Sequence, residues 1–393
     1  MTRFYFDWAA SAPCDTEAVR TLTDTLVRYP GNPSSLHSPG KEARAFTEEC
    51  RQKCAEALQI PPETVIFTSG GSESNNIVIS SFLRKRQPIT AIATSIEHPS
   101  VLNPLFELKN AGHTVGFLKT TDTGVFSLDD LKRRLTPSTA LVCLIHTHNE
   151  AGTVQPVTEA VRLIRDFERE HGARIHVHCD AVQAAGKTAP DWTTADVDSA
   201  SLSAHKFGGP RGVGLLYLKK PLQPLYSGGG QERGLRPGTE NVPGIAAMTI
   251  ALQQRTLRRD KETTAARKIR RMLTNAFSAE PHILLPFFES ARPDAENDAR
   301  FSPYVLTLAI PGLPSEVTQR LLDDRGVAVS AGSACSANAV ANKQKLKNPF
   351  GFDKKTADSL LRLSWGHSTT EDDALALIKA VQSVIRENTI LLR

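Results

Sequence analysis

Lys206 is the first residue in this sequence whose surroundings suggest chemistry. It follows a strand-like segment at 199–203 and is followed closely by two glycines, in the run SAHKFGG at 203–209. A lysine in such a place has little room to extend into water, and burial lowers the pKa of an amine so that it can act as a nucleophile. The ordinary alternative is a lysine in a surface turn.

Asp180 is the second candidate, because it directly follows a strand-like apolar segment. A carboxylate at the C-terminal edge of a sheet could pair with a cationic ring nitrogen of a ligand. His176 and His178 lie on the same face as Asp180, since side chains alternate with a period of two along a strand. Together with His146 and His148 they raise the alternative of a metal site. Their spacing matches no zinc motif, so we expect no metal.

The segment 68–74, TSGGSES, follows a strand-like stretch and opens a helical pattern. Glycines let backbone N–H groups approach an anion, and the N-terminus of a helix favours negative charge. Ser72 could donate to a phosphate, or it could simply cap the helix. The sequence here contains neither a P-loop nor the glycine-rich dinucleotide motif, so the choice is between a phosphate site and an ordinary helix cap.

Cys335 lies within the run AVSAGSACSANA at 328–339, where nearly every neighbour is small. Such a run contributes little to a core, so we expect a mobile or closely packed loop with an accessible thiol. The other five cysteines are interpreted most simply as small buried apolar side chains. They are Cys14, Cys50, Cys54, Cys143 and Cys179.

Short apolar strands alternate with helical stretches through the first two thirds of the chain. The strand candidates are 65–68, 89–94, 140–146, 174–179, 199–203 and 214–218, and the helix candidates are 38–58, 72–86, 99–111, 128–135 and 157–170. This alternation predicts an α/β fold with a parallel sheet and helices on both faces. Ligands of such sheets bind beyond the C-terminal ends of the strands.

The pattern changes after about residue 243. The later candidates are a long amphipathic helix at 244–277, strands at 304–309 and 326–330, and helices at 315–324 and 370–387. We therefore expect a large domain at 14–255. A small α+β domain is expected from residues 1–13 and 256–393, and it would carry the cysteine loop.

The composition excludes several classes of protein. Charged residues make up 23% of the chain and hydrophobic residues 40%, which excludes wholesale disorder. The net charge of 47 − 42 = +5 is spread along the chain, so we expect no nucleic-acid binding. No apolar run reaches the roughly 18 residues that span a bilayer, and residues 1–10 do not read as a signal peptide. The six cysteines form no C-x-x-C pair, which favours a reducing cytoplasm.

Taken in order, these segments resemble the cysteine desulfurases, which belong to the class V, fold-type I enzymes dependent on pyridoxal 5′-phosphate (PLP). The resemblance covers essentially the whole chain. The motifs that carry it are 6–13, 31–35, 67–75, 97–98, 149–152, 178–183, 203–206, 236–241, 333–335 and 362–364. Their order and spacing together are specific. The resemblance implies a fold-type I architecture with a mostly parallel central sheet, helices on both faces, and a smaller α+β domain.

The resemblance also implies roles for the matching residues around the PLP ring. Lys206 would hold PLP as a Schiff base and then act as acid and base at the substrate Cα. Asp180 would keep the ring nitrogen protonated, which makes the ring an electron sink. Gln183 would donate a hydrogen bond to the ring oxygen. His98 would stack on the ring face and move protons.

Further roles implied by the resemblance concern the phosphate and the substrate. The phosphate would be held by Gly71, Ser72, Ser203 and His205, with Thr239 of the partner subunit reaching into the site. Asn149 would contact the cofactor and, with Arg362, orient the substrate carboxylate. The planar guanidinium of arginine suits a carboxylate because the two can form paired hydrogen bonds.

The reaction implied by the resemblance converts L-cysteine to L-alanine and leaves the sulfur as a persulfide on Cys335. A sulfur-acceptor protein, in iron–sulfur cluster assembly or thiolation, would take it from a homodimer, and Cys335 would transiently ligate a cluster. A thiol is only a few per cent thiolate near pH 7, so His98 is the candidate that helps to deprotonate it. The alternative is a selenocysteine lyase, or another aminotransferase or β-lyase of the same fold.

Two departures from the family pattern stand out. His367 occupies a place where the family usually has arginine. Residues 340–355 form a lysine-rich segment unlike the usual one, which is either a solvated loop or a docking surface for the acceptor. Its lysines are Lys343, Lys345, Lys347, Lys354 and Lys355.

Overall fold

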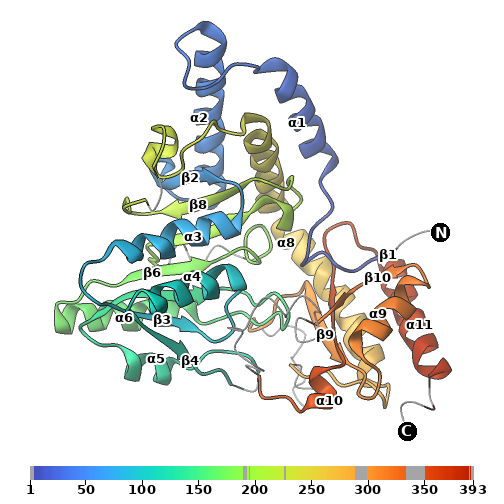
Figure 1. Ribbon diagram of the computed structural model, residues 1–393. Coiled ribbons are helices and arrows are strands. Elements are labelled where there is room, and N and C mark those ends of the chain that lie inside the picture. The colour runs from blue at the N-terminus through green and yellow to red at the C-terminus, as the bar shows by residue number, and fades with distance from the viewer. Residues whose placement is uncertain are drawn as a thin grey trace.

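The computed structural model describes residues 4–121, 123–188, 193, 195–224, 227–287, 299–332, 350–388 and 390. A seven-stranded sheet in the order β2-β8-β7-β6-β5-β3-β4 forms the centre of the larger part (Figure 1). Its strands are β2 (Val65–Thr68), β3 (Thr90–Thr94), β4 (Thr114–Leu118), β5 (Thr139–Ile145), β6 (His176–Asp180), β7 (Ser199–Ser203) and β8 (Gly214–Leu218). The mostly parallel central sheet of the predicted fold class is confirmed.

Strand β8 is the exception to the parallel arrangement, since it runs antiparallel to both β2 and β7. The connection between β7 and β8 covers only residues 204–213. A parallel crossover needs a dozen or more residues, usually with a helix, whereas antiparallel neighbours can be joined by a short turn. Lys206 lies in this turn, at the end of the 3₁₀ segment Ala204–Lys206.

Alternate residues of the central strands pack into different apolar clusters on the two faces of the sheet. Phe67 belongs to the cluster that includes α2 (Ser38–Leu58), α6 (Val157–His171) and the first half of α8 (Val242–Ser278). Its neighbour Ile66 packs on the other side, where α3 covers the sheet. The remaining helices of this part are α1 (Thr16–Arg28), α3 (Gly71–Ser81), α4 (Pro99–Asn110) and α5 (Leu128–Arg134). Helices therefore cover both faces, as predicted.

The smaller part contains a sheet of three strands, a sheet of two strands and its own core. Its elements are β1 (Phe4–Tyr5), β9 (Val305–Ala309), α9 (Ser315–Asp323), β10 (Val327–Ala328), β11 (Ser330–Ala331), α10 (Lys354–Ala357), β12 (Leu360–Ser364) and α11 (Glu371–Glu387). Strand β1 pairs with β10, so the N-terminal segment lies beside α9 and α11, at the right of Figure 1. Phe6, Phe277 and Trp365 are buried together in this core.

Helix α8 connects the two cores without a break. Its residues 245–252 pack in the large cluster of the central sheet, and its residues 266–277 pack in the small one. The predicted domain boundary at 255/256 lies inside this helix, and the domain limits stay a prediction. None of the helices in the described ranges is long and apolar enough to cross a membrane.

The sequence prediction missed five of the described α-helices and strands: β1, β4, β12, α1 and α10. β4 is an edge strand whose residues are mostly half-buried, and it contains Gly116, so its apolar pattern is weak. β12 has Arg362 at its centre. α1 exposes Val19, Leu26 and Val27, so it lacks a clean apolar stripe. The predicted strand at 326–330 is split into β10 and β11, with Val329 between them.

Candidate active site

One cavity of about 390 Å³ gathers residues from both parts of the molecule. Ligand pockets typically enclose about 300–1,000 Å³. The candidates that line it are Gly71, Ser72, His98, Asn149, Asp180, Gln183, Ser203, His205, Lys206 and Arg362. Of the described candidates, Thr239 alone lies outside this cavity, and its side chain is exposed. Cys335 lies outside the described residues.

The Lys206 amine is held by the N-terminal segment. Its Nζ donates to the carbonyl oxygens of Ala9 at 2.7 Å and Ala10 at 2.8 Å. Burial and the charge of Arg362 lower the pKa of Lys206 to about 8, against the opposing charge of Asp180. A much larger fraction of this amine is therefore neutral near neutral pH than in an ordinary lysine, as a nucleophile or base requires.

The Asp180 carboxylate is oriented by a chain of buried polar groups. Its Oδ2 accepts from Asn75 Nδ2 at 2.9 Å, and its Oδ1 accepts from the backbone N–H of Val182 at 3.1 Å. Asn75 Oδ1 lies 2.8 Å from Nε2 of His178, whose Nδ1 contacts the Ser199 hydroxyl at 2.8 Å. Burial lowers the pKa of His178 to about 3, so its neutral ring donates to Asn75 and fixes the direction of the amide.

The histidines near Asp180 therefore serve hydrogen bonding in this structure. His176 contacts the same Ser199 hydroxyl at 2.8 Å, and burial lowers its pKa to about 4. Within the described ranges, no group of three histidine, cysteine or carboxylate side chains could hold a metal ion.

His98 caps α4 with its own ring. Nδ1 accepts from the backbone N–H of Ser100 at 3.1 Å and lies 2.7 Å from the Ser100 hydroxyl. Desolvation by the surrounding protein lowers the pKa of His98. The charge of Asp180 opposes this effect, and the charge of Lys206 adds to it. Because a backbone N–H can only donate, Nδ1 carries no proton, and the neutral ring holds its proton at Nε2. In this state Nε2 is the hydrogen-bond donor of the ring.

The N-terminus of α3 lies at the cavity, which Gly71 and Ser72 line. Gly70 has φ of +149°, a conformation that L side chains rarely adopt. A Cβ on Gly71 would lie only 2.5 Å from Cγ2 of Val182, so this position needs glycine. The Ser203 side chain lies beside both glycines. His205 faces the same cavity, and burial lowers its pKa to about 4. Backbone N–H groups at such a helix end favour a phosphate.

Arg362 of β12 also lines the cavity. Its NH2 donates to Asp7 Oδ1 at 2.8 Å and to the Ser330 hydroxyl at 2.9 Å, and its NH1 donates to the carbonyl of Asn149 at 3.3 Å. Its buried Nε–H has no hydrogen-bond partner among the described residues. Buried arginine donors are normally paired, and the rest of this guanidinium follows that rule.

Some residues of this site were missed by sequence reasoning. Asn75 lies four positions after Gly71, one helical turn along the same face of α3, and this spacing could have indicated it. Asp7 and the carbonyls of Ala9 and Ala10 come from the N-terminal segment, and no sequence pattern connects them with Lys206.

The described cysteines correct one prediction. Cys50, Cys54, Cys143 and Cys179 are buried as expected, whereas Cys14 is exposed. The prediction that all five are buried is wrong for Cys14, since the chain there crosses the surface before α1 begins. Burial raises the pKa of Cys50 to about 11 and that of Cys54 to about 12, so these two thiols stay protonated.

Comparisons with known proteins agree with this geometry. Residues 4–377 match the family described as aminotransferase class-V. The chain is 36% identical to a "NifS/IcsS protein homolog" of Lactobacillus delbrueckii subsp. bulgaricus, over 97% of this chain and 96% of that protein. It is 34% identical to "Putative cysteine desulfurase IscS 1" of Bacillus subtilis, over 99% of this chain and all of the relative. A solved structure titled "NIFS-LIKE PROTEIN" has a TM-score of 0.88 at 30% identity, covering 98% of this chain and 100% of that one.

Proposed function

We propose that this chain, which belongs to the aminotransferase class-V family and within it to the cysteine desulfurases, performs its reaction in the cavity between Lys206, Asp180 and Arg362. The chain is a PLP-dependent cysteine desulfurase, which converts L-cysteine to L-alanine and passes on the sulfur. The residue roles, the assembly and the acceptor are the proposals that follow. PLP, when bound, supplies an electron sink for the negative charge that develops on the substrate Cα.

The described residues fit this cofactor. Asp180 is a buried carboxylate that could pair with a protonated ring nitrogen, and Asn75 holds its orientation. The end of α3 at Gly71 leaves room for an anion where a side chain would collide. The Lys206 amine lies in the same cavity. In this arrangement Ser72, Ser203 and the backbone of α3 would hold the phosphate. His98 would lie against the ring, and Gln183 would donate to the ring oxygen.

Arg362 and Asn149 would orient the substrate. Arg362 lines the cavity and would meet a carboxylate there, while Asp7 and Ser330 hold its NH2 group. Lys206 would then take and return the proton at the substrate Cα, and its lowered pKa leaves part of the amine neutral for this purpose. Positioned acid–base groups of this kind typically contribute about 10²–10⁴ in rate.

Cys335 would receive the sulfur. Gly332 lies beside β12, because its N–H donates to the carbonyl of Leu360. Cys335 follows Gly332 by three positions in the sequence. Its thiolate would attack the substrate sulfur, so that an S–S bond forms as the Cβ–S bond breaks. The electron pair of the broken bond, with a proton, completes alanine. L-cysteine and the thiol thus give L-alanine and a persulfide without an external oxidant. His98 would move protons in this step.

The partners belong to the same proposal. We infer a cytoplasmic homodimer in which Thr239 of the partner subunit completes the phosphate site, because Thr239 is exposed and lies outside its own cavity. The acceptor would be a protein of iron–sulfur cluster assembly or thiolation. Lys354 and Lys355 begin α10, and they are the described part of the lysine-rich segment that could meet it. The other lysines of this segment lie outside the described residues.

The observation that carries this proposal is the convergence of Lys206, Asp180 and Arg362 on one cavity. The test is turnover of L-cysteine, with alanine and reductant-released sulfide measured together. Cys335→Ala should abolish both products while PLP stays bound, and Lys206→Ala should lose the absorbance of covalently held PLP. Cys14→Ala, at an exposed cysteine, should keep full turnover. Full turnover in Cys335→Ala would overturn the assignment of the nucleophile.

Subunit mixing tests the homodimer. Lys206→Ala and Thr239→Ala should each be impaired alone. A mixed dimer of the two contains one site with both wild-type residues, so mixing should recover part of the activity. No recovery after verified subunit exchange would show that Thr239 acts within its own subunit or outside the site.

A further inference from the structure

Lys187 is a buried lysine that none of the roles above uses. Its side chain is 9% exposed. Its Nζ donates to Gln183 Oε1 at 2.9 Å, and this is its one hydrogen bond among the described residues. Burial, together with the charges of Lys206 and Arg362, lowers the pKa of Lys187 to about 7. Buried lysines are costly, and they concentrate at functional sites.

The Gln183 amide is held at both of its ends. At one end its oxygen faces the Lys187 amine, which offers hydrogen-bond donors. The nitrogen of the amide is then directed the other way, where Nε2 donates to the carbonyl of Ala9 at 2.9 Å. An amide nitrogen carries two hydrogens, and the second remains for a ligand in the cavity that Gln183 lines.

The same carbonyl also links this pair to Lys206. Ala9 O accepts from Gln183 Nε2 and from Lys206 Nζ, at 2.9 Å and 2.7 Å. Lys187, Gln183, the Ala9 carbonyl and Lys206 thus form one continuous hydrogen-bonded chain. A shift of the Gln183 amide would disturb both a cofactor contact and the support of the Lys206 amine.

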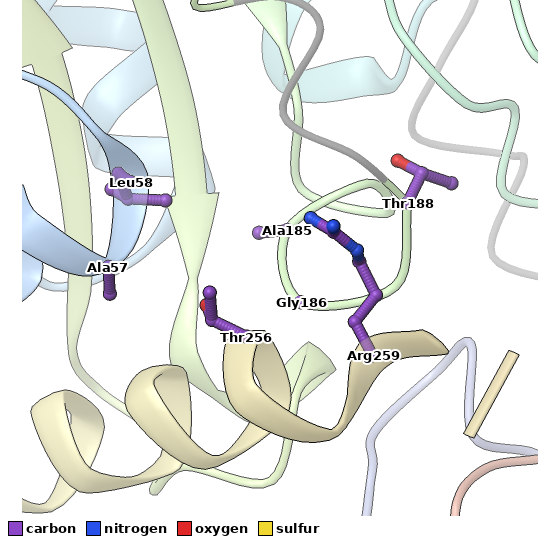
Figure 2. Close-up of a pocket in the computed structure, with 7 residues that line it drawn as sticks. All are labelled: Ala57, Leu58, Ala185, Gly186, Thr188, Thr256 and Arg259. Carbon is purple, nitrogen blue, oxygen red and sulfur yellow. The ribbon is translucent and has the colours of Figure 1, made fainter. Parts of the chain in front are cut away.

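The backbone around Lys187 is locked in place. Gly186 has φ of +71°, and a Cβ there would lie 2.8 Å from Cβ of Arg255 on α8. Lys187 N donates to the Ala184 carbonyl at 2.9 Å. Figure 2 shows the same turn, with Ala185 and Gly186 facing Thr256 of α8 across a cavity of only about 10 Å³. The turn therefore has little space to move, and it holds the lysine at a fixed distance from Gln183.

We propose that Lys187 is a positioning residue, which holds the Gln183 amide with its N–H directed at the ring oxygen of PLP. This inference rests on the proposed function of Gln183. Lys187 touches neither cofactor nor substrate in this assignment. It acts by holding the oxygen of the amide, while the Ala9 carbonyl holds the nitrogen, so that an N–H rather than the oxygen is presented to the ring.

Two substitutions separate the hydrogen bond from the charge. Lys187→Met and Lys187→Gln both remove the charge, but only glutamine keeps an N–H donor. Apoenzyme of each variant is titrated with PLP by absorbance, and the pH midpoint of the absorbance change of bound PLP is recorded. Lys187→Met should weaken PLP binding about 3–10-fold, as expected for one hydrogen bond. It should also raise the pH midpoint, because a donor at the ring oxygen stabilises its negative charge. Lys187→Gln should lie closer to wild type, and Lys109→Met, on the exposed end of α4, should match wild type.

A double-mutant cycle with Gln183→Ala decides how Lys187 acts. If it acts through Gln183, adding Lys187→Met to Gln183→Ala should weaken PLP binding no further. Equal losses in both backgrounds would mean that Lys187 only supports packing, and the inference would fail while the role of Gln183 stands. Gln183→Ala with wild-type affinity and spectrum would instead refute the role proposed for Gln183, and with it this inference.

Discussion

Nζ of Lys206 donates to the carbonyl oxygen of Ala9 at 2.7 Å, although the two residues are 197 positions apart in the sequence. Ala9 belongs to the N-terminal segment, which is anchored in the small core by Phe6 and Trp8. Lys206 belongs to a turn of the central sheet. The amine therefore lies where the two cores meet, and its surroundings depend on both.

The first prediction concerns the pH dependence of PLP attachment. Covalent capture needs the neutral amine, and the Lys206 pKa of about 8 lies below the ordinary 10.5. The rate of PLP incorporation into apoenzyme should rise through a midpoint near pH 8 and level off above it. Arg362→Gln removes a charge that lowers this pKa, so its midpoint should move to higher pH. Stopped-flow absorbance measures both. Arg20→Gln on α1 serves as the control and should keep the wild-type midpoint. A rate of incorporation that still rises steeply toward pH 10.5 would contradict the prediction.

The second prediction concerns Asn75. Asn75→Ala removes the side-chain donor that orients Asp180. A hydrogen bond to a charged group contributes about 1.5–3 kcal/mol, so PLP binding should weaken roughly 10–100-fold. Fluorescence titration of apoenzyme measures the change. Asn103→Ala, at an exposed position of α4, should leave PLP affinity unchanged. An Asn75→Ala protein with wild-type affinity would show that the Val182 N–H alone suffices to orient the carboxylate.

The third prediction concerns the close approach at Gly71. Gly71→Ala should weaken PLP binding at least about 10-fold, because its Cβ would collide with Val182. Gly71→Ala combined with Val182→Ala removes the colliding methyl and should recover most of the loss. Gly230→Ala is the matched control, since a Cβ there meets nothing within 4 Å. A double variant as weak as Gly71→Ala would point to blocked phosphate contacts rather than to this collision.

The fourth prediction concerns a buried ion pair. Arg51 NH2 lies 2.9 Å from Glu232 Oε1, and both side chains are almost fully buried. Removing the Glu232 charge leaves the buried Arg51 with the exposed Glu48 as its remaining ion-pair partner, so Glu232→Gln should cost up to about 3–5 kcal/mol of stability. Glu49→Gln breaks the exposed pair with Lys53 and should cost less than about 1 kcal/mol. Denaturant titration compares the two variants, and equal losses would refute the prediction.

The sequence indicated most of the site because its residues lie at strand ends and at a helix start. Asp180 ends β6, Lys206 follows β7, and Gly71 begins α3. In a sheet whose strands alternate with helices, such positions meet at one edge. The strand and helix segments were found to within a few residues, because β-branched apolar runs and helical periodicity are local signals.

By itself, then, the sequence determined the fold class, the chemical side chains and their likeness to the cysteine desulfurases. Tertiary structure alone decided how those side chains are charged and aimed. The pKa of Lys206 depends on burial and on Arg362, and the direction of the Gln183 amide depends on Lys187. Two further features were seen only in the tertiary structure: the antiparallel direction of β8 and the contact of the N-terminal segment with Lys206. Desolvation and hydrogen-bond geometry arise only when segments distant in sequence come together, so no local pattern encodes them.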